Sequence, residues 1–135
     1  MSTELFAPLL SYILGVAFLY ALLTLMRAPV IWGIGADSEG KNPYADIEPR
    51  ASANLSNQFE WPVLFYLICA ILIARPEFYQ GFYLWLAWIF VLGRVLHSIV
   101  QIFTKNIRLR GTVFNINFLA VLIMWGALCI GVLSR

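Results

Sequence analysis

Charged residues are scarce in this sequence, and their scarcity excludes a soluble fold. Of 135 residues only 12% are charged and 61% are hydrophobic, and the mean hydropathy is +0.82. A soluble domain of this length cannot bury so much apolar surface, because much of the area of a small domain stays exposed to solvent. We therefore expect a single domain, residues 1–135, that has lipid as its solvent.

The residues that build metal and redox sites are also rare. The sequence has one histidine and two cysteines, and none of them belongs to a cluster with metal-ligand spacing. Cys69 and Cys129 both lie in apolar stretches, where a thiol is more often a packing residue than a disulfide partner or a nucleophile. A net charge of +2, with few and scattered basic residues, gives no indication of nucleic-acid binding.

Long apolar runs, by contrast, are abundant. A hydrocarbon core about 30 Å thick requires roughly 20 apolar residues in a helix. Four runs meet this requirement, at approximately residues 5–26, 55–74, 78–103 and 112–133. Each run is continuous rather than alternating, which favours helices over the strands of a barrel. The sequence therefore predicts an all-α integral membrane protein, a bundle of four transmembrane helices.

The links between these runs differ in length and in charge. Residues 27–50 form the only long link, which is polar and long enough to fold over a site. The second link (74–77) is a tight turn, and the third (105–111) is a short basic loop. Links one and three contain six Lys and Arg residues and the opposite side has two, so we expect both links in the cytoplasm and both termini across the membrane. The short, loop-poor chain favours a bacterial inner membrane.

Two groups of polar residues have helical spacing within the apolar runs, so each group shares one helix face. They are Arg94, His97 and Gln101 in the third run, and Arg50, Asn54, Asn57 and Glu60 at the start of the second. With the expected topology both faces lie in the cytoplasmic half of the bilayer. Arg108 and Arg110 fall at the same level. The sequence thus predicts one polar layer supplied by several segments.

Arg94 is the costliest member of this layer. It lies nine residues before Phe103, about 13 Å from that end of a helix, and a lipid-facing arginine at such depth costs about 2.5 to 3.5 kcal/mol. We therefore expect it to face protein or water and to have a partner. Glu60, the only acid within a run, is the expected partner.

Two interpretations of the layer remain open. An Arg94–Glu60 pair could lock two helices together, with His97 and Gln101 bonding between helices. Alternatively, the excess of arginine over acid suits an anionic ligand or anionic lipid head groups.

Two motifs carry a resemblance to a known family. NQFEWPVLF (57–65) resembles the N-x-x-E-x-x-P-x-F signature of MAPEG, the membrane-associated proteins in eicosanoid and glutathione metabolism. RVLHSIVQIF (94–103) with NIRLRG (106–111) resembles that family's Arg-x-x-His motif and the arginine before its fourth span. The resemblance covers almost the whole chain. It implies a homotrimer of four-helix subunits, with glutathione bound between neighbouring subunits in the cytoplasmic half.

Residue roles follow from the resemblance by position. Those implied to bind glutathione are Arg50, Asn57, Glu60, Arg94 and His97. Arg110 matches the arginine that stabilises the glutathione thiolate and is the candidate catalytic residue.

Three positions depart from the family's pattern. Ala53 and Ser56 stand where members have arginine, and Gln101 stands where many have tyrosine. Each lost charge-assisted hydrogen bond removes roughly 1.5 to 3 kcal/mol. We expect Arg50 or Arg108 to compensate from another angle, so Arg108 is a further candidate residue for binding glutathione.

The resemblance implies a glutathione-dependent transferase or peroxidase that acts on lipophilic electrophiles or lipid hydroperoxides entering from the membrane. The alternative is a non-catalytic relative, either an accessory subunit of a larger membrane complex or a lipid-binding scaffold. Ala53 and Gln101 favour the alternative. Arg94, Glu60 and Arg110 favour the enzyme.

Overall fold

Helices make up most of the chain. The computed structural model describes residues 1–135. Its elements are the 3-10 helix η1 (Ser2–Leu5), α1 (Phe6–Trp32), α2 (Glu48–Asn57), α3 (Val63–Ala74), the 3-10 helix η2 (Pro76–Phe78), α4 (Phe82–Phe103) and α5 (Ile107–Leu133). Three helical segments are long and apolar enough to cross a membrane, namely η1 with α1, α4, and α5. The prediction of an all-α chain with apolar membrane-spanning helices is confirmed.

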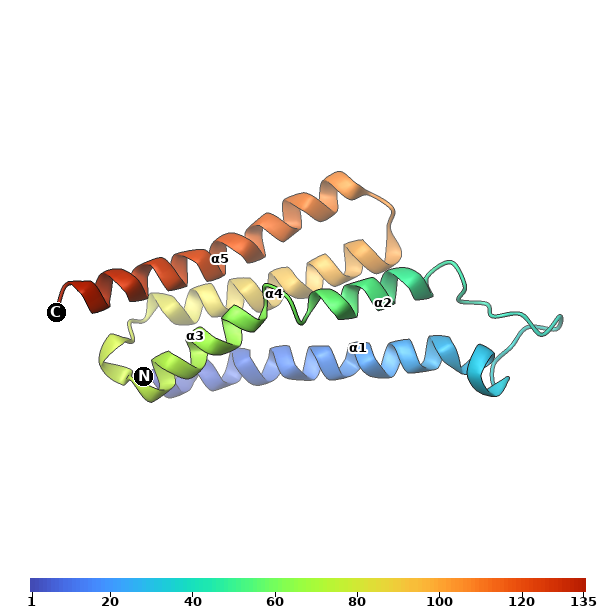
Figure 1. The fold of residues 1–135 in the computed structure, drawn as a ribbon, viewed down its shortest axis with the longest axis horizontal. Coiled ribbons are helices and arrows are strands. Elements are labelled where there is room, and N and C mark those ends of the chain that lie inside the picture. Colours follow the sequence, from blue (N-terminus) through green and yellow to red (C-terminus); the bar gives the residue numbers. More distant parts are fainter.

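The helices lie side by side along one axis (Figure 1). Both termini lie at one end of the bundle, together with the short link between α3 and α4. The long loop between α1 and α2 and the link between α4 and α5 lie at the opposite end, called here the loop end. The two longer polar links therefore share one end of the molecule.

The second apolar run is not one helix, contrary to the predicted continuous helix over 55–74. α2 ends at Asn57 and α3 begins at Val63. Pro62 is the cause, because it has no N–H and its ring would clash with the carbonyl of Gln58 four residues earlier. The intervening residues form tight turns, in which the N–H of Gln58 donates to the Leu55 carbonyl at 3.1 Å. α2 and α3 follow one another along the bundle (Figure 1).

The third link is shorter than the sequence suggested. Residues 107–111 belong to α5, whereas they were expected to form a loop. The side chain of Asn106 accepts a hydrogen bond from the N–H of Leu109 at 3.0 Å, which satisfies one of the free donors at the helix start. Arg110 therefore projects from the first turn of a helix rather than from a loop.

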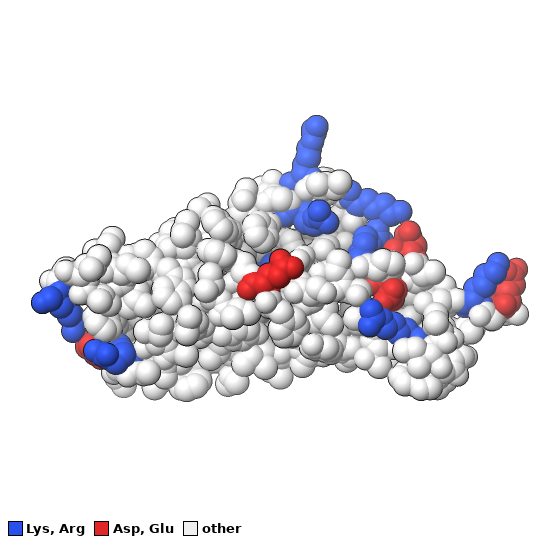
Figure 2. Space-filling view, viewed as in Figure 1, with Lys and Arg blue, Asp and Glu red and all other residues white.

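The charged side chains gather at the two ends of the bundle. Figure 2 shows Lys, Arg, Asp and Glu at both ends and a largely uncharged surface between them. The main core fills the terminal half and includes Tyr12, Phe65 and Phe90, whose rings pack together with 4.2 Å between the centroids of Phe65 and Phe90. The uncharged middle surface is what a lipid environment requires.

Candidate functional site: a basic cavity and an apolar groove

A basic cavity of about 220 Å³ lies at the loop end, among α2, the end of α4 and the start of α5. Three cationic side chains line it, from Arg50, Lys105 and Arg110. The other lining residues are Val100, Gln101, Thr104, Asn106 and Ile107. No acid is among them. The cavity therefore suits an anion with more than one negative group.

The charges of the cavity are only partly compensated. Asp46, an exposed residue of the α1–α2 loop, lies 3.5 Å from Arg50 Nη2 and 3.4 Å from Lys105 Nζ. The Nε of Arg50 is buried and has no hydrogen-bond partner, and Arg110 has no ion pair within 4.0 Å. Such exposed and long pairs contribute little stability. The two arginines are thus available to a ligand.

A chain of buried amides leads from the cavity into the bundle. Gln101 Oε1 accepts hydrogen bonds from Asn54 Nδ2 at 3.0 Å and from Asn57 Nδ2 at 3.3 Å. Gln58 Nε2 donates to the carbonyl of Asn54 at 3.0 Å and to its Oδ1 at 3.2 Å. The Oε1 of Gln58 in turn accepts from Arg94 Nε at 3.3 Å. The amides therefore join a wall of the cavity to Arg94.

The predicted ion pair between Arg94 and Glu60 is wrong within the subunit. No carboxylate lies within 4.0 Å of Arg94, and Gln58 is its hydrogen-bond partner instead. The helical spacing from Arg50 to Glu60 fails because α2 ends at Asn57, and Glu60 lies exposed on the following turn. Arg94 is only 3% exposed, and its Nη2 has no hydrogen-bond partner.

Arg94 also lies at an apolar groove between α1 and α4. The groove has a volume of about 270 Å³. Its polar lining residues are Ser11, Tyr12, Gln58, Arg94 and Ser98, and the hydroxyl of Tyr12 donates to Gln58 Oε1 at 2.5 Å. Most of its lining is apolar, including Leu19, Leu22, Val95, Ile99, Ile102 and Phe103.

The remaining predicted site residues lie apart from the cavity. His97 is buried, its ring centroid lies 6.1 Å from that of Phe114 on α5, and its Nδ1 has no partner. Arg108 is exposed and does not line the cavity. The expected single polar layer is therefore divided into a basic cavity at the loop end and a deeper cluster around Arg94.

The structure adds residues that sequence reasoning did not single out. Lys105 and Asp46 join the basic cavity, and Tyr12 and Gln58 surround Arg94. Gln58 could have been predicted as a site residue, because it lies at the start of the turn that Pro62 imposes. The hydroxyl of Tyr12 gave no signal, because a tyrosine in an apolar run is ordinary.

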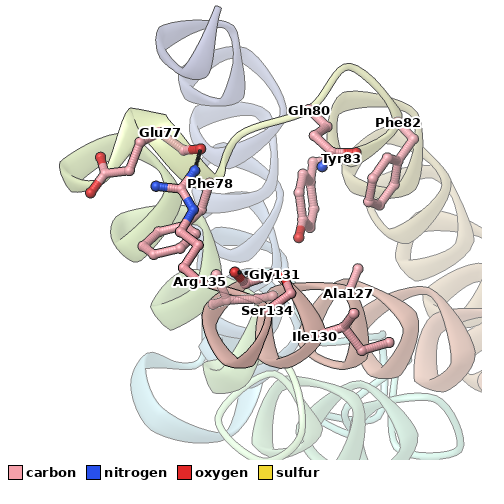
Figure 3. A pocket seen from close by; sticks show the side chains of 11 residues that line it. Glu77, Phe78, Gln80, Phe82, Tyr83, Ala127, Ile130, Gly131, Ser134 and Arg135 are labelled. Carbon is pink, nitrogen blue, oxygen red and sulfur yellow. Dashed lines mark hydrogen bonds between the residues drawn. The ribbon is translucent and has the colours of Figure 1, made fainter.

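A third pocket, of about 380 Å³, lies at the terminal end, and its one lining cation is Arg135. Figure 3 shows Arg135 beside Phe78, with a hydrogen bond from Arg135 to the carbonyl of Glu77. That bond measures 2.6 Å, and the guanidinium lies 4.6 Å from the centroid of the Phe78 ring. This arrangement fastens the end of α5 to η2 and holds the guanidinium in place.

Comparison with known families is decisive for the assignment. The model of the MAPEG family matches residues 5–130. The chain belongs to the MAPEG family. No curated protein and no solved structure matches it. The resemblance in the two motifs is thereby confirmed, and the three long apolar helices agree with an integral membrane protein of the MAPEG family.

Proposed function

We propose that the protein is a glutathione-dependent transferase or peroxidase of the membrane, and that glutathione binds in the basic cavity. The observation that carries the proposal is the cluster of Arg50, Lys105 and Arg110 around one cavity without a lining acid. Membership of the MAPEG family supports it. The co-substrate is a lipophilic electrophile or a lipid hydroperoxide that arrives through the bilayer.

The charges of the cavity match those of glutathione. The tripeptide has two carboxylates, one ammonium group and a thiol. Arg50, with its unpaired buried Nε, and Lys105 would hold the carboxylates. Asp46, which already lies near both of these cations, would accept the ammonium group. Arg110 is left to stabilise the thiolate, which is the nucleophilic form.

Gln101 supports this assignment although members of the family often have tyrosine there. It lines the cavity, and its Oε1 is fixed by two amide donors, from Asn54 and Asn57. Its Nε2 is therefore free to donate to a ligand carboxylate. This Nε2 would provide a contact in place of the missing tyrosine, and Arg94 is joined to Gln101 through the amides of Gln58 and Asn54.

Glu60 supports the proposed homotrimer. It is the only acid away from both ends of the bundle, and it is exposed. Figure 2 shows one acidic side chain in the uncharged middle of the visible face. An acid facing lipid at this depth costs about 2.5 to 3.5 kcal/mol, so a neighbouring subunit is expected to cover it.

We also propose that α2 and α3 together form the fourth membrane crossing. α3 has 12 residues, too few to cross a core of about 30 Å alone. The polar turn between α2 and α3 is tolerated because its amides are bonded inside the protein. The excess of Lys and Arg at the loop end supports a cytoplasmic position for that end, and we propose a bacterial inner membrane as the location.

Isothermal titration of glutathione into the detergent-purified protein at low salt tests the proposal. We expect saturable binding at or below the millimolar range, equivalent to about 4 kcal/mol or more. S-methyl glutathione should bind similarly, because the carboxylates provide most of the contacts. Absence of binding up to roughly 10 mM would refute the glutathione site and favour a lipid-binding scaffold or an accessory subunit of a larger complex.

Two matched variants locate the binding site. Arg50→Gln should weaken glutathione binding roughly tenfold or more, because a charge-assisted hydrogen bond contributes about 1.5 to 3 kcal/mol. Arg135→Gln makes the same chemical change at the opposite end of the bundle and should leave the affinity unchanged. Equal effects of both variants would contradict the assignment to this cavity.

A further inference from the structure

The pocket at the terminal end of the bundle is large enough for a small molecule. Its volume of about 380 Å³ lies within the range of roughly 300 to 1,000 Å³ that is usual for ligand pockets. It lies among η2, the start of α4 and the end of α5 (Figure 3). Because these segments are helix ends, we expect the pocket at the membrane interface, where a solute can enter from water.

The lining of this pocket combines aromatic rings with a few polar groups. Figure 3 shows the rings of Tyr83 and Phe82 on one side of the pocket and Phe78 on the other. Phe82 is 39% exposed, and its ring centroid lies 4.3 Å from that of Tyr83. A flat ring placed against Phe82 would therefore gain an aromatic contact as well as burial. The polar lining residues are Glu77, Gln80, Tyr83, Ser134 and Arg135.

One of these polar residues is buried and has no partner. Tyr83 is only 2% exposed, and its hydroxyl forms no hydrogen bond with the protein. Figure 3 shows this hydroxyl pointing from α4 toward α5, into the pocket. The hydroxyl of Ser134, by contrast, donates to the carbonyl of Gly131 at 3.3 Å. Since buried hydroxyls normally have a partner, the Tyr83 hydroxyl is a position that a ligand can satisfy.

The pocket also has a cation that no acid neutralises. Arg135 Nη2 donates to the carbonyl of Glu77 at 2.6 Å, and the guanidinium lies 4.6 Å from the centroid of Phe78. No carboxylate lies within 4.0 Å of Arg135. The carboxylate of Glu77 accepts from Arg75 Nε at 2.5 Å, and Figure 3 shows it turned away from Arg135. The rim therefore presents a guanidinium that is held in position and suits a carboxylate.

We propose that this pocket binds a small aromatic carboxylate that carries a hydroxyl or similar polar group on its ring. The carboxylate pairs with the guanidinium of Arg135, and the ring lies against Phe82. The polar group on the ring forms a hydrogen bond with the hydroxyl of Tyr83. A plain alkyl acid would pair with Arg135 but leave the Tyr83 hydroxyl unsatisfied, so the pocket selects for a ligand with two polar ends.

This site goes beyond the proposed function, because it is separate from the basic cavity. No residue lines both, and they lie at opposite ends of α4, whose 22 residues span about 33 Å. Binding of the aromatic acid requires no glutathione. Either proposal can therefore fail without the other.

Equilibrium dialysis of radiolabelled ligands against the full chain in nanodiscs, without glutathione, tests the inference. The probes are para-hydroxyphenylacetic acid, phenylacetic acid, which lacks the ring hydroxyl, and para-hydroxyphenethyl alcohol, which lacks the acid. We expect phenylacetic acid to bind about fivefold more weakly than the hydroxy acid, the factor for one neutral hydrogen bond. The alcohol should bind at least about tenfold more weakly, because it loses a charge-assisted contact. The proposal is overturned if either group makes no difference, or if no binding saturates above that of empty nanodiscs.

Two matched pairs of variants locate the binding. Tyr83→Phe should reduce the affinity for the hydroxy acid to that for phenylacetic acid, whereas Tyr79→Phe, which removes a hydroxyl bonded to Glu4 outside the pocket, should preserve the difference. Arg135→Gln should weaken binding of the hydroxy acid at least about tenfold. Arg50→Gln, in the basic cavity, should leave it unchanged, which reverses the pattern expected for glutathione. A difference that survives Tyr83→Phe, or equal effects of the two arginine variants, would assign the acid to another site and overturn the proposal.

Discussion

The contact between Gly93 on α4 and Asn117 on α5 yields a stability prediction with a defined magnitude. A Cβ added to Gly93 would overlap the side-chain oxygen of Asn117. Asn117 is fully buried, so its amide cannot swing into open space. Overpacking of this kind costs about 1 to 3 kcal/mol. Gly→Ala in an unobstructed helix instead gains about 0.8 to 1.0 kcal/mol, as expected for Gly126, which has no neighbour within 4 Å.

We therefore expect Gly93→Ala to be less stable than Gly126→Ala by about 1 to 3 kcal/mol, since both gain the same helix propensity. Both polar side-chain atoms of Asn117, Nδ2 and Oδ1, are buried without hydrogen bonds, so Asn117→Ala should be nearly neutral. The double variant of Gly93 and Asn117 should recover most of the loss, because the added methyl group then has room.

Reversible unfolding in mixed detergent micelles, followed by far-ultraviolet circular dichroism, measures these differences. The four-member cycle isolates the coupling between positions 93 and 117. If Gly93→Ala is as stable as Gly126→Ala, the close approach of α4 and α5 is refuted. The outcome bears on function, because α4 carries Gln101 and α5 carries Arg110, and their spacing defines the basic cavity.

Three further predictions follow from the charged groups. Arg110→Gln should retain glutathione binding but lose most turnover with a lipophilic aryl halide, whereas Arg108→Gln, outside the cavity, should reduce turnover much less. Isothermal titration measures the binding and initial-rate kinetics measures the turnover. Glu60→Gln should weaken the oligomer in detergent, as measured by light scattering, and an unchanged oligomer would mean that Glu60 does not face a neighbour. A hydrogen bond to its own backbone N–H, and then one from Arg75 Nε at 2.5 Å, lower the pKa of Glu77 below the ordinary value of 4.5. The ionised Glu77 carboxylate therefore stabilises the fold fully above that value, and this stabilisation declines as the pH falls toward the lowered pKa. The melting temperature of Glu77→Gln should therefore depend less on pH below 4.5 than that of the unchanged protein.

The sequence was sufficient to predict the long helices but not the break in the second run. Continuous apolar runs determine α1, α4 and α5, because in lipid a helix satisfies every backbone group within its own segment. A hydropathy average over the run is hardly changed by the single residue Pro62. In a helix, however, Pro62 lacks the backbone N–H donor and its ring displaces the carbonyl of Gln58. That displacement shifted Glu60 away from the face that its spacing suggested.

The candidate site was predictable in composition but not in arrangement. Spacing and expected topology identified Arg50, Arg94, Arg108 and Arg110 as an excess of cation. The structure brings Arg50 and Arg110 to one cavity. Lys105 could not be chosen over Arg108 from sequence, because the choice depends on where Asn106 starts α5. If the helix began two residues earlier or later, each side chain near its start would point in a direction rotated by more than half a turn.

The break at Pro62 also explains how a buried arginine persists without an acid. The chain leaves helical geometry at Gln58, so the Gln58 side chain reaches back to Asn54 and across to Arg94 at once. An amide in this place satisfies Arg94 Nε but not Nη2. A carboxylate at the same position would form an ion pair with the guanidinium, the kind of structural lock that the sequence first suggested. Glutamine instead leaves Nη2 buried without an acceptor, so this cluster holds Arg94 in place at a cost that a closed ion pair would not have.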